Sequence, residues 1–369
     1  MKTNRLQRTV LLHDYLNQQG GAEKVLESFL QLYPSAEIYT LLRNKRLFPN
    51  LRVKTSFVQY FPLKKKYKFY MPFFPLAVKS FRLPPNSLLL SSSYAFIKNI
   101  SKPKNSLHIC YCHTPMRYAW DLKETYLQKE NVFLRPFIKL SLSYLSYWDK
   151  KQSNQVDFFI ANSQHVAKRI EKFYQRDAIV IYPPIDTVFF KPSQKRKNDY
   201  YLVVSRLVEY KKVDLVINAF KKLSQKLIIA GSGRDEKQLK KLARGYANIA
   251  FVGRISQKKL RELYQHAKAL VFPQVEDFGI TSVEVQSCGT PVIAFSQGGA
   301  LETVLEGKTG HFFPKQTPES LIKAVKMFET MHFKPKDCRK NALKFDKKIF
   351  KKNIKQYITK KYEEHKNAQ

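Results

Sequence analysis

The chain has 369 residues, of which 44% are apolar and 14% aromatic, and its formal net charge is +37. This length exceeds one ordinary hydrophobic core and fits two domains of about 150–200 residues each. The apolar content excludes a largely disordered protein, and no run of about 18 apolar residues is present that could span a bilayer.

The positive charge is distributed along the whole chain. A field of this strength attracts polyanions, so it predicts nucleic acid, an anionic membrane surface or phosphorylated small molecules as partners, although a general lysine bias would also produce part of it. The apolar stretch after the basic N-terminus covers only Val10–Leu12. Because this is too short for the core of a signal peptide, we expect a cytoplasmic or peripheral protein.

Short β-rich runs alternate with helical patterns in the first half of the chain, as βαβ units require. The first predicted strand, Thr9–His13, ends in a loop at Asp14–Gly21, and a helix follows at Ala22–Leu32. Further strands are predicted at residues 88–91, 107–112, 157–161 and 179–182. The pair Pro183-Pro184 ends this series because proline interrupts regular structure.

A second α/β series begins after the polar residues 193–199. Its predicted strands cover residues 200–205, 226–230, 249–252, 269–272 and 292–295, and its helices include residues 213–223 and 237–244. We therefore predict two doubly wound, Rossmann-like α/β domains, residues 1–190 and 191–345, followed by a basic helical tail over residues 346–369. Ligands of such sheets bind at the carboxyl ends of the strands, so two facing edges would form a cleft.

The four cysteines are too few for a disulfide framework in a chain of this length. Cys110 and Cys112 lie on the same face of a predicted strand, and no second pair with zinc spacing follows. We therefore expect buried, reduced thiols and predict no metal site.

Two candidate features belong to the first predicted domain. Gly20-Gly21 precedes a helix, where glycine lets backbone N–H groups approach a phosphate, although a plain turn explains the pair equally well. His113 directly follows the strand at residues 107–112, and Pro115 restricts the backbone just beyond it. An isolated histidine is more often structural than catalytic, but the carboxyl end of a strand favours a functional role.

The second predicted domain carries cations and glycines after its first two strands. Arg206 and Lys211 lie between a strand and a helix, where they could clamp a diphosphate or could be solvated surface charge. Gly231 and Gly233 follow the next strand, and they indicate either a close approach of the backbone to a ligand or a tight turn.

The strand at residues 269–272 leads into a loop with Glu276 and then into a helix. The backbone N–H groups near the start of this helix suit anionic or hydroxyl oxygens, and they belong to Phe278, Gly279 and Ile280. Glu284 falls in the first turn of the helix, where a carboxylate is either a routine capping residue or a ligand for sugar hydroxyls.

Taken together, these features resemble glycosyltransferase family 4, which has the GT-B fold. Glu276 and Glu284, with seven residues between them, are similar to the E-x7-E motif of that family. Four other segments match in the same order, at residues 14–23, 113–121, 206–211 and 289–303. The run at residues 298–304 is most similar to bacterial mannosyltransferases that assemble O-antigen or other polysaccharides. Ser205 departs from the pattern, because glycine often precedes the arginine.

The resemblance implies a retaining hexosyltransferase that uses a nucleotide-sugar donor and needs neither a cofactor nor a strict metal. It implies that Gly20, Gly21, Arg206 and Lys211 contact the donor diphosphate, and that Glu284 binds the ribose hydroxyls. GDP-mannose is the favoured donor, with UDP-sugars as the alternative. The last helix would cross back to the first domain.

The resemblance also places the transferred sugar. Glu276 would hold its hydroxyls together with the backbone of Phe278, Gly279 and Ile280. His113 would lie over the sugar near the reacting carbon, so His113 and Glu276 are the predicted catalytic residues.

Two segments interleave cations with aromatic residues, at residues 61–82, which contain no acid, and at residues 132–148. Such segments suit an anionic membrane interface, although core aromatics with solvated lysines would look the same. A glycan or polyprenyl-diphosphate-linked acceptor at the inner face of the plasma membrane would need such docking, so we expect a peripheral location there.

Two other classes of function remain. A GT-B epimerase or phosphorylase would share the fold without the transfer reaction, and a phosphorylase would need a lysine for a pyridoxal cofactor. A nucleic-acid-binding protein would explain the charge. However, no zinc finger, RNA-recognition or helix-turn-helix signature is present, so no specific nucleic acid partner is expected.

Overall fold

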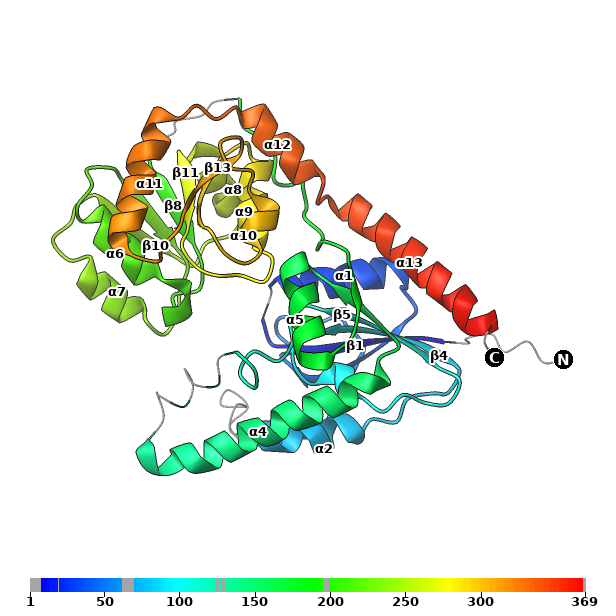
Figure 1. The fold of residues 1–369 in the computed structure, drawn as a ribbon. Coiled ribbons are helices and arrows are strands. Elements are labelled where there is room, and N and C mark those ends of the chain that lie inside the picture. The colour runs from blue at the N-terminus through cyan, green and yellow to red at the C-terminus, as the bar shows by residue number, and fades with distance from the viewer. Residues whose placement is uncertain are drawn as a thin grey trace. The chain divides into compact units, whose positions relative to one another are not determined.

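The computed structural model describes residues 8–18, 20–61, 70–121, 123, 127, 131–194 and 199–367. The chain divides into two compact units (Figure 1). Unit 1 consists of Met1–Pro184 with Phe350–Gln369, and unit 2 consists of Ile185–Ile349. Each unit contains a parallel sheet with helices on both faces, which confirms the predicted pair of doubly wound α/β domains.

In the described part of unit 1, seven parallel strands form one sheet in the order β3-β2-β1-β4-β5-β6-β7. They are β1 (Arg8–Leu16), β2 (Glu37–Arg43), β3 (Val53–Thr55), β4 (Ser87–Ser93), β5 (Leu107–Cys112), β6 (Phe158–Ala161) and β7 (Ala178–Val180). The chain builds outward from β1 to β3 and then returns to the other side of β1 with β4. The strand order therefore reverses between β1 and β4, and such a switch point is where open α/β sheets bind ligands.

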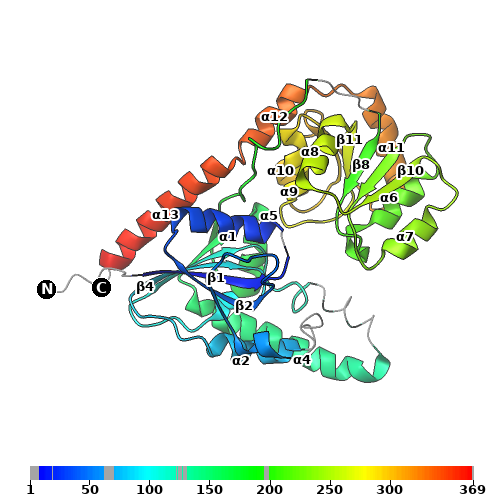
Figure 2. The same ribbon diagram turned by 180° about the vertical axis from the view of Figure 1, so that it is seen from behind.

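Helices cover both faces of the unit 1 sheet because successive strand residues point to opposite faces. One face carries Leu11 and packs against α1 (Gly21–Leu32) and α13 (Lys347–Asn367). In both views α13 runs beside α1, and Phe29 of α1 stacks on Phe350 of α13 (Figures 1 and 2). The other face packs against the helices α2 (Phe74–Lys79), α4 (Arg135–Gln152) and α5 (Gln164–Tyr174).

Unit 2 repeats this plan with the strand order β10-β9-β8-β11-β12-β13, all parallel, among the residues that are described. The strands are β8 (Tyr201–Val204), β9 (Leu227–Ala230), β10 (Ile249–Gly253), β11 (Ala269–Phe272), β12 (Val292–Phe295) and β13 (Gly310–Phe313). Here the order reverses between β8 and β11, which places the second switch point there.

Helices cover both faces of this second sheet as well. One face carries α6 (Val213–Phe220), α7 (Glu236–Leu242) and α11 (Pro318–Thr330). The other carries α8 (Gln257–His266), α9 (Ile280–Ser287) and α10 (Ala300–Thr303), and α12 (Pro335–Leu343) packs against α9.

The prediction that the first strand breaks at Asp14 is wrong, because β1 continues to Leu16. Asp14 is fully buried within the strand. Its carboxylate accepts hydrogen bonds from Ser93 Oγ and from the backbone N–H groups of four successive residues, 94 to 97. Asp14 therefore does not end the strand, as its polar side chain suggested. It connects β1 with the loop after β4 through hydrogen bonds.

The four cysteines are buried and free, so the expectation of reduced thiols is confirmed. Across the described residues, no helix is both long and apolar enough to cross a membrane. The basic-aromatic segment at residues 61–82 falls partly on residues 62–69, which lie outside the described part of the chain.

Candidate active site

The switch point of unit 2 brings together a cation and a carboxylate of the predicted site. Lys211 lies in a 3-10 turn, η6 (Glu209–Lys211), on the connection that follows β8, and Glu276 lies on the loop that follows β11. The Lys211 ammonium forms an ion pair with the Glu276 carboxylate. Gln274 Nε2 donates a hydrogen bond of 3.3 Å to the same oxygen. The two side chains are mostly buried, so the pair interacts more strongly than it would in bulk water.

Two glycines after β12 hold the loop that carries Glu276. A Cβ atom at Gly298 would lie 2.6 Å from the carbonyl oxygen of Glu276, and one at Gly299 would lie 2.4 Å from the Cα atom of Phe278. Gly299 N also donates a 2.8 Å hydrogen bond to that Glu276 carbonyl. The run at residues 298–304 therefore positions the loop that carries Glu276, because only glycine at positions 298 and 299 allows the two backbones to come this close.

Helix α9 begins at Ile280, directly after this loop, so the prediction that Glu284 lies in the first turn of the helix is wrong: Glu284 is the fifth helical residue. Gly279 caps the helix with φ at +93°, a left-handed conformation that favours glycine. Phe278 is buried and packs against Phe345. Glu284 is only 4% exposed, and it accepts a 3.2 Å hydrogen bond from the hydroxyl of Tyr264. Burial, together with the Glu284 carboxylate, raises the pKa of Tyr264 well above its ordinary value, so Tyr264 remains a donor.

Arg206 lies on the connection after β8, where its guanidinium donates a 2.6 Å hydrogen bond to the hydroxyl of Tyr210. Gly231 and Gly233 both lie against protein backbone. A Cβ atom would lie 1.8 Å from the carbonyl oxygen of Ser205 at Gly231, and 2.1 Å from that of Leu207 at Gly233. These glycines are required because the loop after β9 lies against the connection that holds Arg206.

The switch point of unit 1 carries His113. His13 of β1 is paired in register with Ser92 of β4, and Ser92 Oγ lies 3.2 Å from His13 Nδ1 and 2.8 Å from His113 Nε2. His113 N donates a 2.8 Å hydrogen bond to the Ser93 carbonyl, and the side chain of Asn162 donates a 3.0 Å hydrogen bond to the His113 carbonyl. The backbone and the ring of His113 are therefore both held at this sheet edge.

Gly20 is connected to the same cluster through Glu23. The Glu23 Oε2 atom accepts a 2.8 Å hydrogen bond from Gly20 N, and Glu23 Oε1 lies 3.7 Å from His13 Nε2. Gly20 caps α1, and Gly21 is the first residue of that helix.

The structure thus brings Lys211 and Glu276 into contact, and it links Gly20 with His113 through three intervening side chains. Sequence reasoning missed those three, which are His13, Glu23 and Ser92. The acidic residue three positions after Gly20 was the available signal, because a carboxylate there bonds back to the cap. The ligand roles assigned to the site residues remain predictions.

Comparison with solved structures identifies the fold. The fold matches a sucrose-phosphate synthase from Thermosynechococcus elongatus with a TM-score of 0.73 and 16% identity, over 96% of this chain and 99% of that chain. It matches Anabaena HepE in complex with UDP with a TM-score of 0.70 and 17% identity, over 96% and 100% of the two chains. At these identities the likeness concerns the fold, and it confirms the GT-B fold.

Two family models match the chain, one in each half. Residues 19–189 match the model for Glycosyltransferase Family 4, and residues 184–345 match the model for Glycosyl transferases group 1. Both halves of the chain are therefore similar to domains of the glycosyltransferase type, and the two matches together run from residue 19 to residue 345.

Curated relatives agree with this type. A D-inositol 3-phosphate glycosyltransferase of Catenulispora acidiphila is 30% identical over 200 residues, which are 46% of this chain and 47% of the relative. An uncharacterized glycosyltransferase of Methanocaldococcus jannaschii is 30% identical over 242 residues, which are 59% of this chain and 62% of the relative. In both alignments this chain spans less than two thirds of the relative's length.

Proposed function

We propose that the chain is a retaining glycosyltransferase that transfers a hexose from a nucleotide-sugar donor. The observation that carries the proposal is the ion pair between Lys211 and Glu276 at the switch point of unit 2. Glu276 stands eight positions before Glu284, which is buried. A cation and a carboxylate at one sheet edge, with a second carboxylate on the helix that follows, can serve the diphosphate and the hydroxyl groups of such a donor. The matched relatives are themselves named glycosyltransferases, which supports the same reaction class.

The proposed donor roles are those that the resemblance implies, and the chemistry of each group supports them. Arg206 and Lys211, with the backbone at Gly20 and Gly21, contact the diphosphate, because cations and N–H groups stabilise its charge. Glu284 accepts hydrogen bonds from the ribose hydroxyls.

The remaining candidate residues bind the transferred sugar in this proposal. Glu276 and the backbone of Phe278, Gly279 and Ile280 bind the hydroxyls of the transferred sugar. His113 is the catalytic side chain next to the reacting carbon.

The proposed reaction breaks the anomeric bond as the diphosphate leaves. Negative charge develops on the diphosphate, and Arg206 and Lys211 stabilise it in the transition state. The acceptor attacks from the face that the diphosphate leaves, with the leaving phosphate taking the acceptor proton, so no enzyme-bound sugar forms. Mass spectrometry of enzyme quenched during turnover tests this step, and a sugar covalently bound to Glu276 or Asp277 would overturn it.

GDP-mannose is the first candidate donor, on the strength of the similarity at residues 298–304. A UDP-sugar is the second candidate, because solved HepE complexes contain UDP and UDP-glucose. The proposed acceptor is a glycan or a polyprenyl-diphosphate-linked glycan at the inner face of the plasma membrane, which makes the protein peripheral there. The proposal includes no cofactor and no strict metal requirement.

Thermal unfolding with GDP, UDP, ADP and their sugars tests the donor site. A ligand at 100 times its Kd stabilises the folded state by about 2.7 kcal/mol, which raises the midpoint by about 5 °C or more. We expect one nucleotide to do so, and we expect Glu284→Gln to weaken that response. If no nucleotide raises the midpoint, the donor-site proposal fails.

A further inference from the structure

Helix α4 carries apolar side chains on two opposite sides. Its inner side is buried in unit 1 through Leu142, Leu145 and Trp148. Its outer side exposes four large apolar residues, which we call the outer stripe: Phe137 (71% exposed), Leu140 (72%), Tyr144 (51%) and Tyr147 (65%). These positions are separated by three and four residues, so they follow one line along the helix.

The exposed apolar surface extends beyond the outer stripe. Phe133 and Leu134 are exposed in the 3-10 turn that leads into α4, and Phe73 and Leu76 are exposed at α2. Helices α2 and α4 pack on the same core, and both views show them side by side (Figures 1 and 2). Soluble proteins rarely expose apolar patches of this extent unless the patch binds something.

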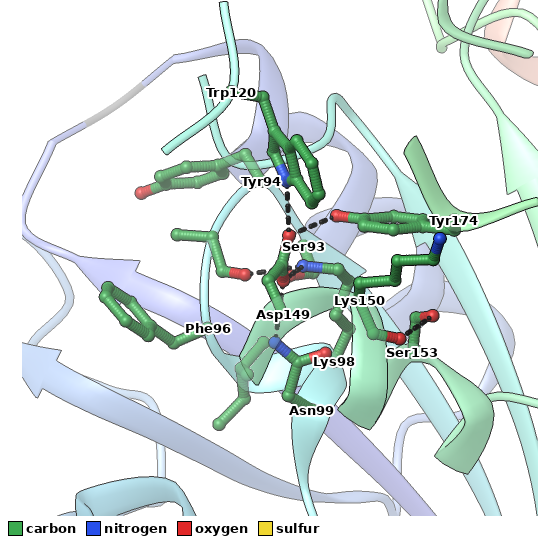
Figure 3. Close-up of polar contacts among 12 residues, drawn as sticks. Ser93, Tyr94, Phe96, Lys98, Asn99, Trp120, Asp149, Lys150, Ser153 and Tyr174 are labelled. Carbon is green, nitrogen blue, oxygen red and sulfur yellow. Dashed lines mark hydrogen bonds and ion pairs between the residues drawn. The ribbon is translucent and has the colours of Figure 1, made fainter. Parts of the chain in front are cut away.

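The C-terminal end of α4 is firmly anchored, so the outer stripe is held facing outward. Asp149 is fully buried and accepts hydrogen bonds from Lys98 Nζ at 2.6 Å, Asn99 Nδ2 at 2.8 Å, Tyr174 OH at 2.7 Å and Trp120 Nε1 at 3.0 Å (Figure 3). Burial opposes the charge on Lys98, but the Asp149 carboxylate together with the neighbouring Cys112 and Cys110 holds the pKa of Lys98 above its ordinary value. Turning the outer stripe inward would break this cluster.

In the described helices α2 and α4, the exposed charges have one sign. Asp149 is the only acidic residue in α4, and it is buried and paired. Lys139, Lys150 and Lys151 of α4 and Lys79 of α2 are exposed. A second copy of the chain would bring these cations against one another, whereas an anionic lipid surface attracts them and accepts the apolar side chains.

We propose that the outer stripe of α4, together with Phe73 and Leu76, inserts into the interface of an anionic phospholipid bilayer. The lysines contact the headgroups while the aromatic and aliphatic side chains enter the boundary of the acyl chains. This surface deepens the proposed function, since it would hold unit 1 where a lipid-linked acceptor is embedded.

Vesicle flotation of the full chain tests the surface without any donor or acceptor, so its result does not depend on the proposed reaction. The probes are phosphatidylcholine vesicles with and without phosphatidylglycerol. The test variant Phe137→Ser/Leu140→Ser/Tyr144→Ser keeps every cation, and we expect its partition coefficient on anionic vesicles to fall about 100-fold. The control variant Leu301→Ser/Met327→Ser removes two apolar residues of unit 2 that are 56% and 54% exposed, and it is expected to bind like the original chain.

Two results would overturn the proposal. In the first, the triple variant binds anionic vesicles as strongly as the original chain, which would mean that net charge alone causes the binding. In the second, the original chain does not float but sediments as a dimer that the triple variant loses, which would assign the outer stripe to self-association.

A second inference concerns the polarity of the hydrogen bonds at the switch point of unit 1. Among the described residues, His13 Nε2 and Glu23 Oε1 are buried and have no hydrogen-bond partner, and the two atoms lie 3.7 Å apart. The other Glu23 oxygen accepts a hydrogen bond from Gly20 N, as a carboxylate does. A carboxylate attracts an N–H group and repels a lone pair, so the proton of His13 belongs on Nε2.

The position of this proton determines the donor and the acceptor in each remaining hydrogen bond between His13 and His113. With its proton on Nε2, His13 offers a lone pair on Nδ1, which accepts the Ser92 hydroxyl proton at 3.2 Å. Because the Ser92 hydroxyl donates its only proton to His13, Ser92 Oγ accepts a hydrogen bond from His113 Nε2 at 2.8 Å. The Ala22 carbonyl, at 3.4 Å from Ser92 Oγ, is the competing acceptor for the serine proton.

We infer that Glu23, through His13 and Ser92, holds His113 in the tautomer with the proton on Nε2 and the lone pair on Nδ1. Under the proposed function, that lone pair accepts a hydrogen bond from a hydroxyl group of the sugar or of the acceptor, and the acceptor proton itself still goes to the leaving phosphate. Glu23, His13 and Ser92 are thus positioning residues for His113.

Nitrogen-15 NMR of the histidine rings in the ligand-free chain tests this assignment, with His113→Gln used to identify the His113 signals. We expect the Nε2-protonated tautomer to dominate at His113, to lose its preference in Ser92→Ala, and to be retained in Ser92→Thr, which keeps the hydroxyl. Glu23→Gln should weaken the preference, since an amide both donates and accepts. An Nδ1-protonated His113, or a preference unchanged in Ser92→Ala, would overturn the inference while leaving the proposed transfer reaction untouched.

Discussion

Replacing Glu276 with glutamine is expected to lower kcat/KM for sugar transfer by about 10²–10³-fold, the typical effect of losing one charged contact in a preorganised site. The neutral amide removes the attraction to Lys211 and the charge that orders the sugar hydroxyls. Lys211→Gln should cost a similar factor. Because the two groups contact each other, the double variant should lose less than the product of the two single losses.

Unit 2 offers a matched control for this prediction. Lys268 immediately precedes β11, at the opposite end of the strand from Glu276, and it forms an ion pair with Glu329. Lys268→Gln breaks that pair at the amino ends of the strands, where no ligand is expected, and should change kcat/KM less than about twofold. The measurement is donor turnover with the nucleotide sugar that stabilises the protein. A Glu276→Gln variant with half of the original activity would contradict the assignment.

Replacing Asp14 with alanine is expected to destabilise unit 1 by about 4 kcal/mol. Five donors, the Ser93 hydroxyl and four backbone N–H groups, would lose a buried charged acceptor at once. Asp14→Asn retains one acceptor oxygen and should lose about half as much.

The two tryptophans of the chain make the measurement specific. Trp120 and Trp148 both belong to unit 1, so tryptophan fluorescence during urea unfolding follows that unit alone. Asp14→Ala should lower the urea midpoint by about 1.5 M. An unchanged fluorescence midpoint would show that the carboxylate does not hold the loop after β4.

Much of the fold could be predicted from the sequence, because buried parallel strands are short apolar runs between helical patterns. The strands at residues 107–112, 269–272 and 292–295 agree with β5, β11 and β12 at both ends. Strand β2 was missed, although five of its residues are buried. Its polar Glu37, Thr40 and Arg43 obscure the pattern, and Thr40 bonds back to the carbonyl of Asp14.

The candidate site was predictable only in part. Loop positions at strand ends pointed to Lys211 and Glu276, since a parallel sheet gathers those ends at one edge. The local sequence pattern does not determine which strands are neighbours in the sheet, so the pairing of His13 with Ser92 could not be predicted. The cluster around His113 depends on that pairing.

The return of α13 to unit 1 also constrains how the protein folds during synthesis. Unit 1 needs Phe350, Ile354 and Ile358 to cover the sheet face around Leu11, yet these residues are translated after all of unit 2. On the ribosome, unit 2 is continuous and can fold once its own segment has emerged, whereas unit 1 waits with an open apolar face. Unit 1, which is synthesised first, therefore completes its folding last. Its uncovered sheet face is the surface that chaperones would have to protect.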